Sequence, residues 1–373
     1  MKSPIRPFTL FLPTLFVLSY VAQSLGQTTS VVGHGTVLHL TVHGKLLEGN
    51  LLGDTPDRTV NVYLPPSYGA EPHRRYPVVY LLHGFTDNPG EWFNEDTKNG
   101  KPWINLPAIA DRVFAADPAH EMILVMPNAN NKFAGSFYSS SVTTGDWEDF
   151  VATELVAYID SHYRTLARPE SRGLGGHSMG GYGTLRIGMK HSDVFSSIYA
   201  LSACCLTVAL PSAGSQSDAG ATSPSSDGKI HSAGLVKNNA DLGKADFFAL
   251  VTLAFAAAWS PDPANPPFYL DLPTQEGKPR MDVVAKWYAN APLVTLDQYA
   301  VGLRQLHALA FDVGKHDEFK QIPVDLAVLD ARLKSYNIPH TFETYDGSHI
   351  DHIPERIEER VLPFFAKNLS FTR

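Results

Sequence analysis

A serine, an aspartate and a histidine stand in this sequence where they could form a nucleophilic triad. Ser178 is the central residue of GHSMG at 176–180, which fits the pattern G-x-S-x-G, and Asp317 and His349 follow later in the chain. A serine hydroxyl is too weak an acid to attack an ester carbonyl unaided, so a histidine must accept its proton and a carboxylate must orient that histidine. The order of the three residues therefore predicts attack by Ser178, proton transfer through His349 and orientation of His349 by Asp317.

The carboxylate has two competitors nearby in the sequence. Asp312 lies inside the apolar segment 308–313, which predicts a strand, and Glu318 directly follows Asp317. A loop just past a strand end lets a carboxylate reach across to the histidine, whereas a residue within the strand suits a structural group. We therefore favour Asp317.

The histidine also has a competitor. His352 follows His349 by three residues, but Gly347 predicts a turn that places His349 immediately beyond a strand at about 340–345. His349, Asp351 and His352 could alternatively bind a cation. Because no third clustered histidine accompanies them, we expect no metal site and favour His349 as the general base.

Two backbone N–H groups are candidates for stabilising the oxyanion that the attack would create. Phe85 follows the apolar segment 77–82, and Met179 follows Ser178 at the start of an expected helix. In a strand–turn–helix site, donors from these two places hold the developing negative charge. The neighbouring histidines, His83 and His177, are expected to be structural.

The elements that must position these residues alternate between short apolar strands and amphipathic helices. This alternation predicts an α/β protein with a mainly parallel sheet and helices on both of its faces. The predicted strands are 58–64, 77–82, 122–126, 172–175, 308–313 and about 340–345; the predicted helices are about 147–162, capped by Asp146, 182–191, one containing Leu326, Leu329 and Leu333, and one opened by Pro354.

Residues from about 206 to 306 interrupt this alternation. The segment 211–228 is rich in Ser, Ala and Gly, 247–259 is an apolar run of helical length, and 261–273 is rich in proline. This composition favours a lid or cap inserted into one catalytic domain, 27–373, rather than a separate domain.

The first 26 residues resemble a secretory signal peptide. Lys2 and Arg6 precede an apolar stretch from Phe8 to Ala22, and small residues follow at 24–26. Such a segment predicts export with cleavage, and hence a secreted or periplasmic protein. A retained membrane anchor is the alternative, because the apolar stretch approaches the lower length limit for spanning; after cleavage no stable membrane insertion is expected.

Composition excludes several classes of protein. The 373 residues include 30 Lys and Arg against 38 Asp and Glu, a net charge of −8, and 44% are hydrophobic. This apolar content argues against wholesale disorder, and the acidic balance without a basic block argues against nucleic-acid partners.

The two cysteines, Cys204 and Cys205, are neighbours. A disulfide between adjacent residues is geometrically demanding, so we favour two small buried apolar side chains and leave a vicinal disulfide open. Neither cysteine is assigned a catalytic role.

Taken together, these motifs resemble those of the putative esterase family, which contains esterase D, the feruloyl and acetyl-xylan esterases of carbohydrate esterase family one, and the mycobacterial mycolyltransferases. The resemblance rests on VYLPP at 62–66, YPV at 76–78, LLHG at 81–84, SFY at 136–138, GGHSMGG at 175–181, Gly314 with Asp317, and Gly347 with His349. It implies an α/β-hydrolase fold, the triad Ser178, His349 and Asp317, and no metal or organic cofactor. The insertion at 206–306 departs from the compact members of the family.

The resemblance and the predicted export together favour a small-molecule or carbohydrate ester as substrate, such as a feruloyl or acetyl ester. Trp92, Tyr138 and Tyr182 are candidate substrate-binding aromatics. Acyl transfer to a sugar or lipid alcohol is the first alternative, and a non-enzymatic binding scaffold is the second. The oligomeric state is left open.

Overall fold

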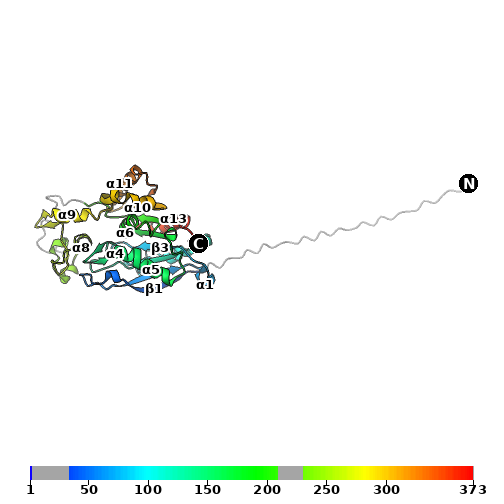
Figure 1. Ribbon diagram of the computed structural model, residues 1–373, viewed down its shortest axis with the longest axis horizontal. Helices are drawn as coiled ribbons and strands as arrows, with labels where there is room; N and C mark the ends of the chain where they lie inside the picture. The colour runs from blue at the N-terminus through cyan, green and yellow to red at the C-terminus, as the bar shows by residue number, and fades with distance from the viewer. Residues whose placement is uncertain (2–32, 209–229, 373) are drawn as a thin grey trace. The chain divides into compact units, whose positions relative to one another are not determined.

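The computed structural model describes Met1, residues 33–208 and residues 230–372 (Figure 1). The predicted signal peptide, beyond Met1, and the segment 211–228 lie outside the described residues. Within the described part of the chain, no helix is both long enough and apolar enough to cross a lipid bilayer.

The main sheet contains eight strands in the order β1-β2-β4-β3-β7-β8-β11-β12. Pairing is antiparallel between β1 and β2 and between β2 and β4, and parallel across the rest of the sheet. The mainly parallel sheet predicted from the sequence is therefore confirmed. The strands are β1 (Thr36–His43), β2 (Asp57–Leu64), β3 (Val78–Leu82), β4 (Ile123–Pro127), β7 (Arg172–His177), β8 (Ser197–Leu201), β11 (Ala308–Gly314) and β12 (Thr341–Tyr345).

Both faces of the sheet are buried, which explains its continuously apolar strands. In β3, Val78, Tyr80 and Leu82 join one hydrophobic cluster, whereas Val79 and Leu81 join another. Alternate residues of a strand point to opposite faces, so helices must cover both. The first cluster includes residues of α5 (Val156–His162), α6 (Met179–Lys190) and α11 (Gln321–Ser335); the second includes residues of α3 (Leu106–Ala116) and α13 (Leu362–Asn368).

The predicted helix at 147–162 is present as α4 (Trp147–Asp149), a π-helical stretch (Phe150–Leu155) and α5 in succession. The Asp146 carboxylate caps it by accepting the Asp149 N–H. The remaining short elements are η1 (Lys45–Leu47), α1 (Ser67–Ala70), α2 (Pro89–Trp92), η2 (Pro118–His120), β5 (Ser140–Ser141), β6 (Gly145–Asp146), η4 (Pro169–Ser171), η5 (Ala233–Leu235), α12 (Ile353–Arg356) and a second π-helical stretch (Ile357–Val361).

Between β8 and β11 the described chain forms helices and one hairpin (Figure 1). The last of these helices, α10 (Pro292–Gln305), packs against α6 and so belongs to the layer that covers the sheet. For the segments between β8 and α10, the lid remains a prediction. The helices and the hairpin between β8 and β11 are α7 (Asn239–Leu242), α8 (Phe247–Trp259), β9 (Thr274–Gln275) paired with β10 (Lys278–Pro279), α9 (Met281–Tyr288) and α10 (Pro292–Gln305).

Candidate active site

Ser178 occupies the sharp turn between β7 and α6. Its backbone has φ of 55° and ψ of −112°, a conformation that L residues rarely adopt. A Cβ on Gly180 would lie 1.9 Å from the Leu82 carbonyl oxygen, and one on Gly176 would lie 2.5 Å from that of Gly180. Glycine is therefore required on both sides of the serine, and the predicted strand–turn–helix context is present.

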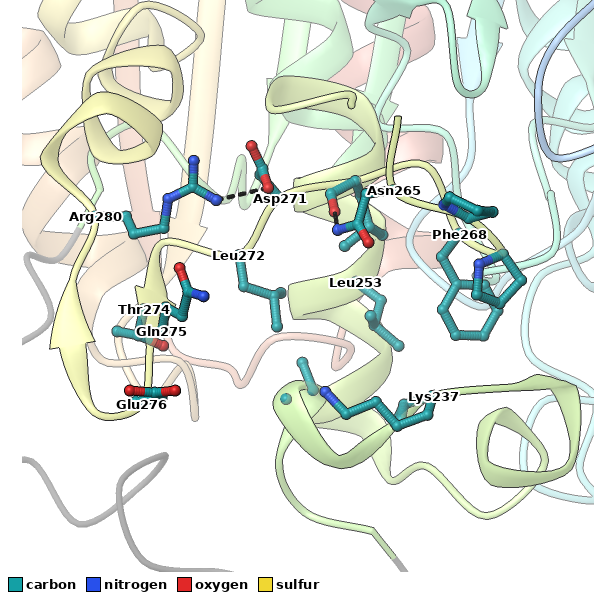
Figure 2. Close-up of a pocket in the computed structure, with 16 residues that line it drawn as sticks. Lys237, Leu253, Asn265, Phe268, Asp271, Leu272, Thr274, Gln275, Glu276 and Arg280 are labelled. Atoms are coloured by element: carbon teal, nitrogen blue, oxygen red, sulfur yellow. Dashed lines mark hydrogen bonds and ion pairs between the residues drawn. The ribbon is translucent and has the colours of Figure 1, made fainter. Parts of the chain in front are cut away.

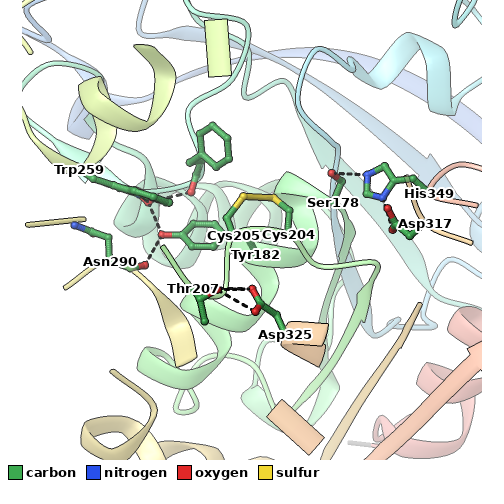
Figure 3. The surroundings of a disulfide bond; sticks show 12 residues. Ser178, Tyr182, Cys204, Cys205, Thr207, Trp259, Asn290, Asp317, Asp325 and His349 are labelled. Atoms are coloured by element: carbon green, nitrogen blue, oxygen red, sulfur yellow. Dashed lines mark hydrogen bonds and ion pairs between the residues drawn. A yellow bond between two sulfur atoms is a disulfide. The ribbon is translucent and has the colours of Figure 1, made fainter. Parts of the chain in front are cut away.

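The three predicted triad side chains lie in hydrogen-bonded sequence (Figure 3). His349 Nε2 is 2.9 Å from Ser178 Oγ, and His349 Nδ1 is 2.7 Å from Asp317 Oδ2. Since an ionised carboxylate can only accept, the imidazole carries its proton on Nδ1 and its Nε2 accepts the serine hydroxyl. Asp317 is fully buried, which leaves this carboxylate directed at the histidine and shielded from water.

The backbone of His349 is also held at both of its polar groups. Its N–H donates to Glu318 Oε2 at 3.0 Å, and its carbonyl accepts the Nε2–H of His177 at 2.8 Å. Each polar group of this residue thus has a partner. Glu318, considered above as an alternative to Asp317, binds the backbone of the histidine rather than its ring.

The remaining competitors lie elsewhere. Asp312 is buried beside Arg356, with 2.6 Å between their charged atoms, and accepts the Tyr199 hydroxyl. Burial raises the pKa of Asp312 to about 6, against the effect of Arg356. His352 packs its ring against Tyr345. Among the described residues, no group of three His, Cys, Asp or Glu side chains is arranged to hold a metal ion.

His177, expected to be structural, contacts the triad directly. Its ring centroid lies 4.8 Å from that of His349, and Trp103 also packs edge-on against it. Burial lowers the pKa of His177 well below its ordinary value, so this imidazole stays neutral, with its proton on Nε2. A neutral ring can lie against His349 while the latter gains a proton, without opposing it as a fixed charge would.

The candidate oxyanion donors, the N–H groups of Phe85 and Met179, make no hydrogen bond to any described residue. His83 orients the N–H of Phe85 through the peptide group that joins Gly84 to Phe85. Its Nε2 accepts the Ala129 N–H at 2.8 Å, so its Nδ1 carries the proton and donates to the Gly84 carbonyl, also at 2.8 Å. Burial lowers the pKa of His83 to about 4. Because the two ends of a trans peptide point in opposite directions, this bond turns the Phe85 N–H away from His83.

A cavity of about 550 Å³ opens beside Ser178. Its volume falls within the range of small-molecule sites, and most of its walls are apolar. The α8 helix supplies one wall, through the predicted apolar run at 247–259. The side chains lining the cavity are Phe85, Phe137, Ser178, Cys204, Cys205, Thr207, Val208, Phe247, Phe248, Val251, Thr252, Phe255, Trp259, Trp287, Phe319, Gln321, Ile322 and Asp325.

The family model of the putative esterases matches residues 55–353. The chain belongs to the putative esterase family. An esterase of Mycobacterium tuberculosis is 32% identical over 147 residues, covering 37% of this chain and 27% of its own length. An endo-1,4-beta-xylanase/feruloyl esterase of Xylanibacter ruminicola is 31% identical over 160 residues, covering 41% of this chain and 21% of its own. These alignments thus cover about a quarter of the relatives' own length.

Solved structures of similar fold cover nearly all of this family member. A ferulic acid esterase aligns with a TM-score of 0.56 at 22% identity, over 90% of this chain and 100% of its own. The S-formylglutathione hydrolase of Staphylococcus aureus aligns with a TM-score of 0.55 at 17% identity, over 90% and 100%. The α/β-hydrolase fold implied by the sequence motifs is confirmed.

The three aromatics predicted to bind substrate are absent from the lining of the cavity in this esterase-family protein. Trp92, Tyr138 and Tyr182 are all fully buried. Trp92 packs edge-on against Trp103, the Tyr138 hydroxyl donates to the His83 carbonyl, and the Tyr182 hydroxyl donates to the Asn290 carbonyl. The three side chains therefore lie in the core rather than in the cavity wall, which corrects the prediction.

Much of the aromatic wall comes instead from the insertion, whose aromatic residues were not predicted to bind substrate. Phe247, Val251, Phe255 and Trp259 recur every four residues along α8, a spacing that places them on one face of a helix. This periodicity was available in the sequence. What it could not show is that this face turns toward Ser178.

Cys204 and Cys205 form a disulfide in the loop after β8, which corrects the preference for two separate thiols. Both residues are partly exposed and line the cavity beside Ser178 (Figure 3). The Cys204 N–H donates to the Ser178 carbonyl at 3.3 Å. The pair is therefore part of the cavity wall rather than of the core.

A second cavity of about 550 Å³ lies within the insertion (Figure 2). Leu253 of α8 lines it, whereas its neighbours Val251 and Thr252 line the cavity beside Ser178, so α8 contributes to both. Some of the polar groups here are paired with one another: Arg280 binds Asp271 at 2.6 Å, and the Asn265 amide donates to the Leu270 carbonyl. None of the predicted catalytic residues lines this cavity.

Proposed function

We propose that this protein hydrolyses carboxylic esters through an acyl-enzyme on Ser178. The observation that carries the proposal is the continuous hydrogen-bonded series from Ser178 Oγ through His349 to buried Asp317, at the edge of an apolar cavity. Membership of the putative esterase family supports it.

In the first half of the reaction, Ser178 Oγ attacks the ester carbonyl while His349 Nε2 accepts its proton. Asp317 stabilises the imidazolium that forms, and the N–H groups of Phe85 and Met179 hold the oxyanion. The N-terminus of α6 adds its partial positive charge at the same place. Collapse of the intermediate expels the alcohol, which takes the proton from His349.

In the second half, a water molecule attacks the acyl-enzyme with His349 as general base. The carboxylic acid then leaves and Ser178 regains its proton. The aromatic walls of the cavity suit an apolar acyl group, and the relative named a feruloyl esterase supports esters of hydroxycinnamic acids with carbohydrates as substrates. The apolar N-terminal sequence supports export, which would bring the protein to such esters outside the cell.

A fluorophosphonate probe tests the nucleophile directly. The probe is expected to label Ser178, as mapped by mass spectrometry, and Ser178→Ala is expected to lose the label and about 10⁴-fold or more of the p-nitrophenyl ester hydrolysis rate. Ser192→Ala, at a serine just past the end of α6, is the matched control. Hydrolysis by Ser178→Ala at the wild-type rate would refute the proposal. Acceptor alcohols added to the assay distinguish hydrolysis from acyl transfer, because transfer yields a new ester instead of the free acid.

A further inference from the structure

Asp325 is a buried carboxylate in the wall of the catalytic cavity that the mechanism above does not use. It lies on α11, is 3% exposed and lines the same cavity as Ser178. Its oxygens accept the backbone N–H of Thr207 at 3.2 Å, the Thr207 hydroxyl at 2.9 Å and the Gln321 side-chain amide at 2.7 Å. All of these donors are neutral.

This pairing is unlike that of the other buried acids. Within residues 33–208 and 230–372, no Lys, Arg or His side chain lies within ion-pair distance of Asp325, and every other buried Asp or Glu has such a partner. Burying a carboxylate is costly, and neutral donors offset that cost less well than a cation does. The pairs are Asp87 and Glu91 with Lys98, Asp111 with His34, Glu121 with Arg74, Glu148 with Arg186, Asp312 with Arg356, and Asp317 with His349.

The carboxylate also has capacity to accept another hydrogen bond. Two carboxylate oxygens offer about four lone-pair sites, and the three donors present occupy only some of them. Most of the side chains that line the cavity are aromatic or aliphatic, so a ligand hydroxyl entering it would meet few other strong acceptors. A hydroxyl that donates to a carboxylate away from water forms a short, charge-assisted bond.

Asp325 lies within reach of a substrate bound at Ser178. The Ser178 carbonyl accepts the Cys204 N–H, and Thr207, which binds Asp325, follows Cys204 by three residues (Figure 3). Three residues of chain span at most roughly 10 Å. A propenoyl chain with a benzene ring covers a similar length from its ester carbonyl to a substituent opposite the chain.

We propose that Asp325, held in place by Thr207 and Gln321, is a polar subsite that accepts a hydroxyl group at the far end of the substrate's acyl moiety. The proposal rests on the proposed function, because it assigns a specificity determinant to the same cavity. Asp325 selects for acyl groups that are apolar along their length and end in a hydrogen-bond donor, such as a ring with a hydroxyl opposite the ester chain.

A matched pair of substrates isolates this hydroxyl. Methyl 4-hydroxycinnamate and methyl cinnamate differ in it alone, and the wild-type protein is expected to favour the first by about tenfold or more in kcat/KM. Asp325→Asn removes the charge at constant size and is expected to bring this ratio close to one, while methyl cinnamate is hydrolysed within about threefold of the wild-type rate. Thr207→Val removes the hydroxyl that donates to Asp325 but keeps the backbone N–H donor and the carboxylate, and is expected to retain the preference.

Several outcomes would overturn the subsite. They are equal rates of the wild-type protein on the two esters, an equal loss on both esters in Asp325→Asn, or a preference that follows a hydroxyl on the alcohol rather than on the acyl group. If Asp325→Asn does not fold, calorimetry on Ser178→Ala keeps the proposal testable, since methyl 4-hydroxycinnamate must bind about tenfold more tightly than methyl cinnamate. Failure of the wild-type protein to hydrolyse either ester, without labelling of Ser178, would instead refute the proposed function and the subsite with it.

Discussion

Replacement of His177 by phenylalanine tests how the reactive histidine is held. The substitution keeps an aromatic ring in contact with Trp103 and His349 but removes the Nε2–H that binds the His349 carbonyl. The ring of His349 would still face Asp317 and Ser178. Its backbone would lose one of the two hydrogen bonds that fix the loop.

The expected magnitude follows from the burial of this contact. Leaving a buried carbonyl without its donor costs about 1–3 kcal/mol. Since about 1.4 kcal/mol in the barrier changes a rate tenfold, displacement of His349 from Ser178 is expected to lower kcat by about 5- to 150-fold. KM should stay within about threefold, because neither the substituted ring nor the lost bond faces the cavity.

Steady-state kinetics on a p-nitrophenyl ester would measure both constants. His177→Gln keeps an amide N–H able to reach the same carbonyl and is expected to recover much of the lost kcat. His316→Phe is the control, because His316 is an exposed histidine that pairs with Asp346 near the site without contacting His349.

Unchanged kcat in His177→Phe would show that the contacts with Asp317 and Glu318 suffice to position His349, and would refute the role assigned to His177. The same conclusion would follow if His177→Gln and His177→Phe lost equal activity together with an equal fall in Tm. In that case the ring would serve packing and not the orientation of the triad.

Three further substitutions test other parts of the structure. Asp317→Asn offers His349 Nδ1 an amide donor in place of an acceptor, so the wrong tautomer of His349 forms and kcat should fall by about 10⁴-fold. A loss below tenfold would argue against a role of Asp317 in orienting His349. Glu318→Gln, at the carboxylate that binds only the His349 backbone, provides the comparison. Gly180→Ala places a Cβ against the Leu82 carbonyl oxygen and should prevent stable folding. In the control Gly69→Ala, the added Cβ has no atom within 4 Å. Equal Tm values for the two variants would contradict the requirement for glycine in the turn. Although burial opposes ionisation of Glu148, hydrogen bonds and positive charges from His191, Arg186 and Lys190 lower its pKa to about 2, below its ordinary value of 4.5. Its ionised form should therefore stabilise the fold by up to about 3 kcal/mol above pH 4.5 and lose this contribution as pH falls toward 2, so Tm should fall less steeply over that range in Glu148→Gln than in the wild-type protein.

Local pattern in the sequence was enough to predict the framework of this protein. The continuous apolar strands are explained by a sheet buried on both faces, and the helix at 147–162 begins at the predicted cap, Asp146. Two strands of the main sheet escaped prediction. The edge strand β1 (Thr36–His43) is largely exposed, so burial imposes little pattern on it, and β8 (Ser197–Leu201) lies in a short apolar run without turn signals at both ends.

The arrangement of Ser178, Asp317 and His349 was also predictable, because each follows a parallel strand and the carboxyl ends of parallel strands meet at one edge of a sheet. The roles of His177 and His83 were not. Each acts through one backbone carbonyl, that of His349 and that of Gly84 respectively, and no residue pattern records which carbonyl a side chain will reach.

The walls of the cavity depended entirely on tertiary structure. Trp92, Tyr138 and Tyr182 lie close to the site along the chain, yet packing turns them into the core, whereas Phe255 and Trp259 of α8 reach it from far away in the sequence. The neutral setting of Asp325 likewise arises because the loop after β8 meets α11. The residues of the triad could therefore be predicted from their types and order in the sequence. The residues that line the cavity could not, because they depend on which helices and loops pack together in the fold.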